Sequence, residues 1–382
     1  MISPKAVLAV LPFMLLACGP SQEWGGTVVE EAGGVRIENP AEPLAGPGSV
    51  SVELLWTASS PEEGDLWEAP RRLHVGDSVI YLLDRQASRI HRVSLQGDLL
   101  GSLGEMGQGP GQYGRLVDAI PVHVGLFVVD AGNGRVEVLA PGGEIRASVA
   151  LDQYVFSALP LGREAIVVFG ALGRGHGWQR IDSRGNITSF AFPELETGNA
   201  SEPPPSREAT WGDRLVRMEL TVPRFWTYSS SGVLERMVHI PFSPEEADEG
   251  KLQAMAQEIA DVMAEDGIPA GVIRQQVDAM KARYRINPRF RDIRFDDGSG
   301  LTAILEQDPE DFGAGPATLH LLSLEGVYLG TLPFNRPWAD FDLRDGCLYV
   351  LARDPLTDLV TLQVYALVVP EGLLDRAREL TS

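Results

Sequence analysis

Apolar and polar positions alternate in short segments along most of the chain, and Gly, Asp, Asn and Ser separate these segments. The pattern is sharpest at Val79–Asp84 and Leu126–Asp130, each of which is an apolar run that ends in Asp. Short apolar runs bounded by turn residues predict β-strands joined by tight turns. We therefore expect an all-β chain made of many short antiparallel strands.

The two sharp segments belong to an internal repeat with an offset of 46 residues. In both copies an Arg follows the Asp by five residues, and a turn glycine follows that Arg by eight. Weaker copies continue to the C-terminus. Their turn glycines are Gly185, Gly232 and Gly326, and a last copy begins at Cys347. A sheet of three or four strands cannot bury both of its faces alone, whereas radial stacking of such sheets buries both. The repeat therefore predicts a six-bladed β-propeller.

The sixth unit lacks its final strand, because it ends at Ala366. The run Ser51–Trp56 near the N-terminus can complete that unit, which would close the ring and remove two open sheet edges. A β-sandwich or an unrelated series of meanders is the alternative fold. A seven-bladed WD-repeat ring is disfavoured, because no unit carries the Gly-His and Trp-Asp signature. We place the propeller at residues 49–370.

A segment of different character interrupts the ring between blades four and five. Ser243-Pro244-Glu245-Glu246 has the features of a helix start, with Ser as the N-cap and Pro at the first helical position. Apolar residues then recur at steps of three and four, first at Leu252, Met255, Ile259 and Met263, and later at Ile273, Val277, Met280 and Tyr284. This spacing predicts an inserted α-helical hairpin, residues 243–286, either a lid over the channel or a structural decoration. Residues 371–382 predict a short C-terminal helix.

The N-terminus has the layout of a bacterial lipoprotein signal. Lys5 precedes the apolar run Ala6–Ala17, and Cys18 follows its small residues directly. The run is too short to span a bilayer. It predicts a signal peptide at 1–17, Cys18 as the acylated first residue of the mature protein, and a lipidated tether and N-terminal segment at 18–48. An ordinary secretory signal and a buried first helix are the alternatives. Gly19 favours the outer membrane, so we expect a lipid-anchored envelope protein on its periplasmic or surface face.

The amino-acid composition narrows the range of possible binding partners. The net charge is −21, and a nucleic-acid binder needs the opposite sign, so we expect no nucleic acid. The same charge repels anionic lipids, so attachment to the membrane depends on the acyl chains. The other cysteine, Cys347, lies in a strand-like run, and we expect it to be a small buried residue. An acylated Cys18 leaves it no disulfide partner, so the core must hold the fold. We expect a monomer.

One stretch carries a family resemblance. Gly104–Tyr113, followed by Leu126–Val136 with its Asp-Ala-Gly-Asn element, resembles an NHL-type repeat. The chain is similar to the bacterial exported six-bladed β-propeller lipoproteins, and this resemblance implies a propeller in the cell envelope. Blades three and four lack the Asp-x-Gly-Asn element. Six-bladed relatives include calcium-dependent lactonases and a lyase acting on peptide derivatives, which hold a metal in the central channel. No residue here matches their ligands one by one.

The sequence contains no zinc-protease helix, Gly-x-Ser-x-Gly elbow or Cys-x-x-Cys pair. We therefore predict no catalytic residue, no metal site and no cofactor. Asp84 and Asp130 are expected to bind turn backbone, and Asp296–Gly300 to form a turn rather than a calcium loop. The predicted function is a non-catalytic binding scaffold for a protein, peptide or glycan. The alternative is a metal-dependent hydrolase or lyase with its site in the channel. The candidate binding face consists of polar residues near strand ends in the first two units: Arg85, Gln86, Glu105, Gln108, Asn133 and Arg135.

Overall fold

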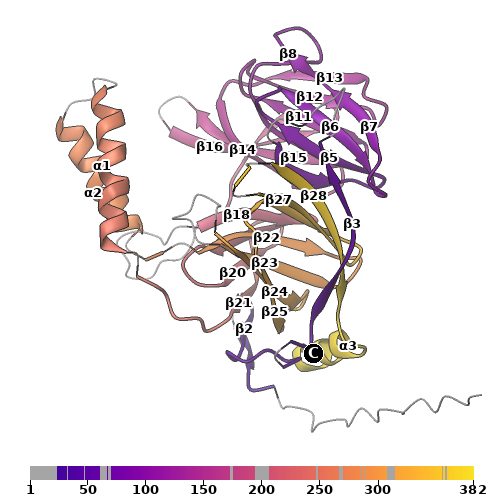
Figure 1. Cartoon of the computed structure of the whole chain (residues 1–382), viewed down its shortest axis with the longest axis vertical. Helices are drawn as coiled ribbons and strands as arrows, with labels where there is room; N and C mark the ends of the chain where they lie inside the picture. Colours follow the sequence, from indigo (N-terminus) through magenta and orange to yellow (C-terminus); the bar gives the residue numbers. More distant parts are fainter. Residues whose placement is uncertain are drawn as a thin grey trace, which may run out of the picture.

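The computed structural model describes residues 24–382 except residues 32, 47, 61–66, 68–69, 173–174, 194–205, 247, 266–269, 285, 288, 308–314, 355 and 358. The described strands form a six-bladed β-propeller with two helices standing to one side of it (Figure 1). Blade one comprises β4 (Pro70–Val75), β5 (Val79–Asp84), β6 (Arg89–Ser94) and β7 (Leu99–Leu103). Blade two comprises β10 (Leu116–Val122), β11 (Gly125–Asp130), β12 (Arg135–Leu139) and β13 (Ile145–Ala150). The loop between these blades carries the short parallel pair β8 (Glu105–Met106) and β9 (Gln112–Tyr113).

The remaining blades follow in chain order. Blade three comprises β14 (Tyr154–Leu161), β15 (Ala165–Leu172), β16 (Gly175–Asp182) and β17 (Ile187–Phe190). Blade four comprises β18 (Ser206–Trp211), β19 (Arg214–Glu219), β20 (Arg224–Tyr228) and β21 (Leu234–His239). Blade five comprises β22 (Phe290–Asp296), β23 (Leu301–Gln307), β24 (Ala317–Ser323) and β25 (Tyr328–Phe334). Blade six comprises β26 (Trp338–Arg344), β27 (Cys347–Arg353), β28 (Val360–Val368) and β3 (Ser51–Ser59).

The ring closes as the sequence predicts. β3 pairs antiparallel with β28, with Trp56 opposite Val364, so an N-terminal strand completes the last blade. The innermost strands contact one another around the ring in the order β4, β10, β14, β18, β22 and β26, and β26 contacts β4 again. This arrangement ties the two ends of the propeller together and pairs the edge that β28 would otherwise expose.

The N-terminal segment contributes two strands that the sequence pattern did not reveal. β1 (Thr27–Glu31) pairs with β2 (Gly34–Glu38), and β2 adds in parallel to β21 at the outer edge of blade four. Asn39 follows β2 and is buried; its side chain accepts a hydrogen bond from the Tyr328 amide at 2.8 Å and donates one to the Gly326 carbonyl at 2.9 Å. The segment therefore joins blade four to blade five.

The apolar core is divided into six clusters, one between each pair of neighbouring blades. Alternate side chains of each strand face the two neighbours, which is how stacked sheets bury both faces. The smallest cluster lies between blades three and four, where Leu161 and Val167 meet Leu215 and Tyr228. Each fully buried side chain of this size contributes about 1.5–3 kcal/mol, so among the described residues this boundary has the smallest contribution from fully buried side chains.

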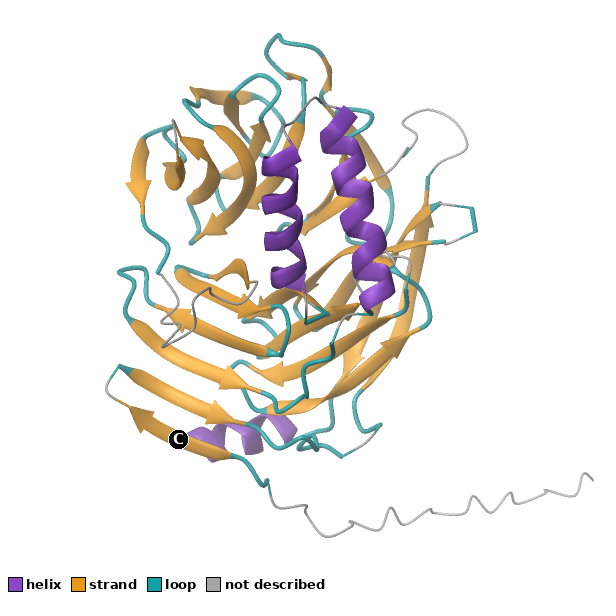
Figure 2. Cartoon of the chain, turned by 90° about the vertical axis from the view of Figure 1, so that its left-hand side faces the viewer, coloured by secondary structure: helices purple, strands orange, loops and turns teal. Residues whose placement is uncertain are grey.

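Two helices lie between β21 and β22. They are α1 (Glu249–Glu265) and α2 (Ala270–Tyr284), and they contact each other side by side (Figure 2). At the base of the two helices, the backbone amide of Asn287 donates to the backbone carbonyl of Glu245 at 2.8 Å. A third helix, α3 (Leu373–Thr381), buries Leu373 and Ala377 against the core between blades five and six. Within the described residues, none of these helices combines the length and hydropathy needed to cross a membrane.

Candidate binding site in the propeller channel

Five of the six innermost strands carry a β-bulge near their start. The pairing register shifts by one residue in β4, β10, β14, β22 and β26. A bulge inserts one residue into a strand and changes which side chains face a given side. The residues that follow the bulges are Arg72, Asp118, Ser157, Asp292 and Asp340. Each of these five blades thus places one polar or charged residue at the same level of the channel.

These residues belong to a group of ionisable side chains that we call the charge belt. Its members are Arg72, His74, Asp118, Arg207, Asp292, Arg294, Asp340 and Asp342, and they come from five blades. Blade three contributes Ser157 at this level and no charge. Three of the four carboxylates are at most 5% exposed, so they need charged or hydrogen-bonding partners to remain ionised.

Arg294 is the central cation of the belt. Its guanidinium nitrogens lie 2.6 Å from Asp292, 3.3 Å from Asp340 and 3.9 Å from Asp342. Burial opposes the charge on Arg294, but these carboxylates outweigh it and raise the pKa of the guanidinium. Burial also works against the charge on Asp292, but Arg207, 3.1 Å away, and Arg294 together lower the pKa of that carboxyl far below its ordinary value. Both ends of this network therefore stay charged.

A second pair joins blades one and two. His74 Nε2 lies 2.7 Å from Asp118 Oδ1, and the same oxygen accepts the Ala119 amide at 2.8 Å. Burial alone would lower the pKa of His74, but the Asp118 charge and hydrogen bond reverse the shift and raise it. Burial would raise the pKa of Asp118, but His74 and the cation of Arg72 lower it to about 2. The pair is therefore ionised in weakly acidic solution.

Backbone amides bind the carboxylates of blade six. Asp340 Oδ2 accepts the Leu73 amide at 2.9 Å, and Asp342 Oδ2 accepts the Val75 amide at 2.8 Å. Both bonds run from blade six to blade one, across the point where the ring closes. The belt thus fixes the relative position of the blades as well as lining the channel.

The belt borders a cavity of about 450 Å³, which we call the channel cavity. Its charged lining includes Arg72, Arg207 and Arg294 together with Asp118, Asp292 and Asp342. Its apolar lining, which we call the apolar wall, includes Leu159, Pro160 and Trp178. A cavity of a few hundred Å³ with apolar walls and a few convergent polar groups has the usual size and character of a ligand site.

Polar contacts between turns form the rim at one end of the channel. Each contact joins the turn after one innermost strand to the corresponding turn of the next blade. They are Arg344–Asp77 at 2.6 Å, Asp77–His123 at 3.8 Å, His123 N–Arg163 O at 3.0 Å, Gly162 N–Gly212 O at 2.7 Å, Trp211 Nε1–Asp297 at 2.7 Å and Gly346 N–Asp296 at 2.8 Å. Gly162, Gly212, Trp211 and Asp297 also line the channel cavity, so the cavity reaches this rim.

The belt does not have the composition of a metal centre. Among the residues that the structure describes, no three His, Cys, Asp or Glu side chains come together in a group suited to a metal ion. The carboxylates of the belt are bound by arginines, His74 and backbone amides instead. Asp296, considered for calcium, accepts the Gly298 amide at 3.0 Å in the turn between β22 and β23, as the turn prediction expects.

The six residues of the predicted binding face lie at the opposite end of the blades, in the loop from blade one to blade two and the turns beside it. Most of their polar groups bind that loop. Arg135 donates to the carbonyls of Gln108, Gly109 and Gln112, and Asn133 donates to the Gly107 carbonyl at 2.8 Å. Glu105 accepts from Gln112 at 2.7 Å.

The Arg85 side chain donates to the Val117 carbonyl at 2.8 Å, at the bulge of β10. The backbone amide of Gln86 donates to Asp84 Oδ1 at 3.1 Å. Asp130 accepts the amides of Gly114 and Arg115 at 3.1 and 3.0 Å. The prediction that Asp84 and Asp130 bind turn backbone is confirmed. Among the six predicted residues, the side chains of Gln86 and Gln108 form no hydrogen bond or ion pair with the described part of the chain.

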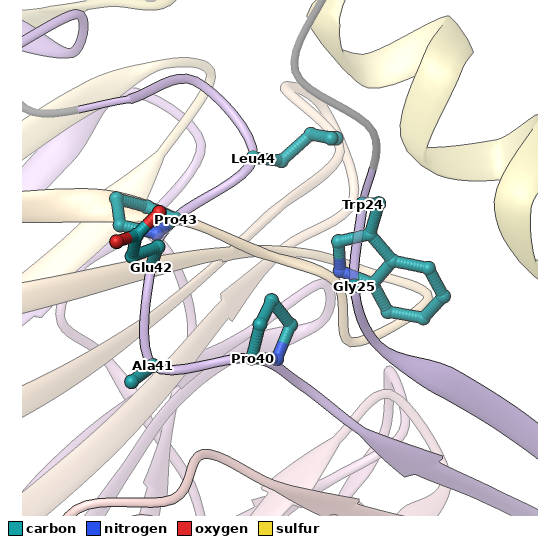
Figure 3. Close-up of a pocket in the computed structure, with 7 residues that line it drawn as sticks. All are labelled: Trp24, Gly25, Pro40, Ala41, Glu42, Pro43 and Leu44. Carbon is teal, nitrogen blue, oxygen red and sulfur yellow. The ribbon is translucent and has the colours of Figure 1, made fainter.

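Two further hollows lie outside the channel. An open depression of about 360 Å³ borders the blade one to two loop and is lined in part by Glu105 and Gln112. A smaller cavity of about 220 Å³ lies in the N-terminal segment, with Trp24 on one side and Glu42, Pro43 and Leu44 on the other (Figure 3). Neither shares a lining residue with the channel cavity.

Sequence analysis did not single out the charge belt. One signal was present: Arg72 and Asp118 are 46 residues apart, the same offset as the two sharp repeats. The expectation for Cys347 is met in part, since the residue is half-buried against the core between blades six and one. Burial raises the pKa of its thiol, which makes it a poor nucleophile.

Comparison with known proteins agrees with the fold. The sequence matches no protein-family model and no curated protein. Solved structures do match: a member of the DUF4221 family from Bacteroides vulgatus has a TM-score of 0.59 at 10% identity, over 84% of this chain and 99% of that chain. A presumed exported protein from Bacteroides fragilis has a TM-score of 0.54 at 12% identity, over 87% of this chain and 99% of that chain. These similarities place the chain in the class of six-bladed β-propellers.

Proposed function

We propose that this protein is a membrane-anchored, non-catalytic binding scaffold at the bacterial cell envelope, and that the channel cavity receives part of a protein, peptide or glycan partner. The observation that carries the proposal is the preformed cavity beside a charge belt whose carboxylates are already bound by arginines, His74 and backbone amides. Such a site can recognise a ligand without rearranging, because its charged groups are held in place before binding.

The same pairing makes Asp118 and Asp292 unsuited to acid–base chemistry. A general acid or base works best with a pKa near the operating pH. The pKa of Asp118 lies at about 2, with burial opposed by His74, and the pKa of Asp292 is lower still because of Arg207 and Arg294. A metal-dependent hydrolase or lyase, the alternative function, would also need a cation in the channel. Stabilisation of the purified protein by calcium or zinc, abolished by Asp292→Asn, would favour that alternative.

The anchor is the part of the proposal that the sequence alone supports. Cys18 and the signal peptide lie outside the described residues. We expect Cys18→Ser to release the protein from the membrane fraction and to abolish incorporation of labelled fatty acid. A Cys347→Ser variant serves as the control, because its labelling and fractionation should match the wild type. Membrane retention of Cys18→Ser would contradict acylation as the anchor.

The binding role is tested by site-specific photo-crosslinking in native membranes. The crosslinker is placed at Thr210, which lines the channel cavity, at Gln108 on the predicted loop face, or at Val233, which is 59% exposed on the outer turn of blade four. We expect a discrete adduct from Thr210 and none from Val233. An adduct from Gln108 alone would move the partner to the loop face, and the absence of any specific adduct would contradict the scaffold function.

A further inference from the structure

Arg72 differs from the other members of the charge belt. Its side chain lines the channel cavity, yet no hydrogen bond or ion pair within 4 Å joins its guanidinium to any residue in the described part of the chain. Its interactions are with the more distant charges of Asp340, Asp118 and Asp292. A guanidinium carries five N–H donors in a fixed planar fork, so Arg72 offers unused donors to the cavity.

The nearby carboxylates are engaged by other donors, and none of them forms an ion pair with the Arg72 guanidinium. Asp118 is held by His74 and the Ala119 amide, and Asp340 by the Leu73 amide and Arg294. Asp292 accepts its neighbouring Ile293 amide at 2.9 Å and pairs with both Arg207 and Arg294. The acceptor that Arg72 lacks must therefore come from solvent or from a ligand.

Additional arginines lie on the same side of the belt. Arg85 reaches the Val117 carbonyl at the bulge of β10, and Arg291 occupies the bulge of β22. Burial lowers the pKa of Arg85, and the positive charge of Arg72 lowers it further. Burial likewise lowers the pKa of Arg291, and the positive charge of Arg207 lowers it further. A chain with a net charge of −21 therefore places several arginines at this level of the channel, beside the carboxylates of the belt.

The apolar wall sets the shape of the ligand. Leu159, Pro160 and Trp178 present apolar surface to the same cavity. An inorganic anion would leave this wall without contacts, whereas an organic acid would cover it. Burial of apolar area adds to affinity, and the charged contact fixes the orientation of the ligand.

We infer that the channel cavity binds an organic carboxylate with an apolar body, and that the guanidinium of Arg72 is the principal donor to its carboxylate. The planar fork of Arg matches the two oxygens of a carboxylate, which favours this group over a neutral acceptor. The inference rests on the proposed function only in assigning binding to this cavity. It identifies the ligand by its chemistry, as a free acid or as the carboxyl end of a peptide.

The experiment is calorimetric titration of the purified mature protein with three probes: N-acetylphenylalanine, N-acetylphenylalaninamide and glucuronate. The acid and the amide differ only in the charged group, so their ratio isolates the contact with Arg72. We expect the acid to bind at least roughly tenfold more tightly than the amide, the usual range for a hydrogen bond to a charged group. Arg72→Gln should abolish this preference, and Arg72→Lys should retain part of it.

Arg146→Gln is the matched control, because it removes the same charge from an exposed position on β13 in the outer part of blade two. It should leave the acid-to-amide ratio unchanged. Equal binding of acid and amide to the wild type, or an unchanged ratio in Arg72→Gln, would overturn the inference. Tighter binding of glucuronate than of N-acetylphenylalanine would overturn the apolar part. A specific crosslink from Thr210 together with equal binding of acid and amide would leave the scaffold function standing and reject only the carboxylate.

Discussion

The pair His74–Asp118 offers a direct test of the charge belt. Asp118 is 4% exposed, and its carboxylate lies 2.7 Å from His74 Nε2. Asp118→Asn keeps the shape of the side chain but removes its charge. The amide can still accept one hydrogen bond, so the variant isolates the electrostatic contribution of the carboxylate. We expect the folded protein to lose stability, by an amount that depends on pH.

The magnitude follows from the pKa values. Burial opposes ionisation of Asp118, but His74 and Arg72 bring its pKa to about 2, close to two units below the ordinary value. At about 1.4 kcal/mol per unit, the charge contributes about 2 kcal/mol, and loss of one partner from a buried pair costs about 3–5 kcal/mol. Because the variant retains the hydrogen-bonding shape, we expect a loss of about 3 kcal/mol in the free energy of unfolding at pH 5.5.

The pH dependence has a defined sign at each end. The contribution of Asp118 is present above its unfolded pKa of about 4 and is lost as the pH falls through about 2. Burial lowers the pKa of His74, but Asp118 raises it overall, so the contribution of His74 is present below its unfolded pKa of about 6.5. It disappears as the pH rises through the raised value. The difference between wild type and variant should therefore be largest between about pH 4 and 6.5.

Urea unfolding of the purified protein at pH 3, 5.5 and 8 measures this difference. His123→Gln provides the matched control: His123 is exposed and lies 3.8 Å from Asp77, so its removal should change stability by less than about 1 kcal/mol. A wild-type-to-variant difference that is the same at pH 5.5 and pH 8 would show that the buried pair is not ionised, and the reasoning would fail.

Two further substitutions test the fold. In thermal unfolding, Gly125→Ala should destabilise blade two by several kcal/mol, because φ at this residue is +150° and an added Cβ would lie 1.9 Å from the Leu139 carbonyl oxygen. Gly271→Ala in α2 is the control. Nothing lies within 4 Å of its added Cβ, so this variant should be neutral or stabilising in the same assay. Asn39→Ala leaves the buried Tyr328 amide without an acceptor and should cost about 1–3 kcal/mol, measured by urea unfolding. An unchanged midpoint would mean that the N-terminal strands do not hold blades four and five together.

Local patterns were sufficient to predict the fold. The six units follow from turn chemistry that recurs along the chain, and the closing strand follows from the incomplete sixth unit. Both signals are carried by residues close together in the sequence, where alternation and turn glycines are visible. β1 and β2 were missed because their alternation is short and their role depends on the edge of blade four, more than 190 residues away.

The channel site could not be derived in the same way. Asp340 binds the Leu73 amide and Asp342 binds the Val75 amide across 267 residues of chain, and only the closed ring brings them together. The bulges also shift the alternation by one residue, so a strict two-residue period assigns Asp118 and Asp340 to the wrong face. The residues of the predicted loop face also have a role that the sequence did not reveal: Arg135 and Asn133 bind the backbone of their own loop.

The pairing of β2 also predicts how the proposed acyl anchor would orient the protein. Glu38 lies opposite His239, at the end of β21 that leads to α1, and Thr27 lies opposite Glu38, so the N-terminal segment enters at that end of blade four. Antiparallel order places the rim of the channel cavity at the other end of the strands. The six Cα–Cα steps from Cys18 to Trp24 reach at most about 22 Å, so the proposed acyl anchor would hold the rim away from the bilayer.

Fluorophores at Ser78 and Gln86, which flank the two ends of β5, provide a matched pair about 20 Å apart for testing this orientation. In vesicles that contain brominated lipids, we expect stronger quenching of the label at Gln86, because that turn shares the end of the blades from which the tether leaves. The two labels can be compared directly, since they flank the same strand and experience the same tilt of the whole propeller. Stronger quenching at Ser78 would mean that the channel cavity opens toward the membrane, and the partner would then have to be sought at the lipid surface.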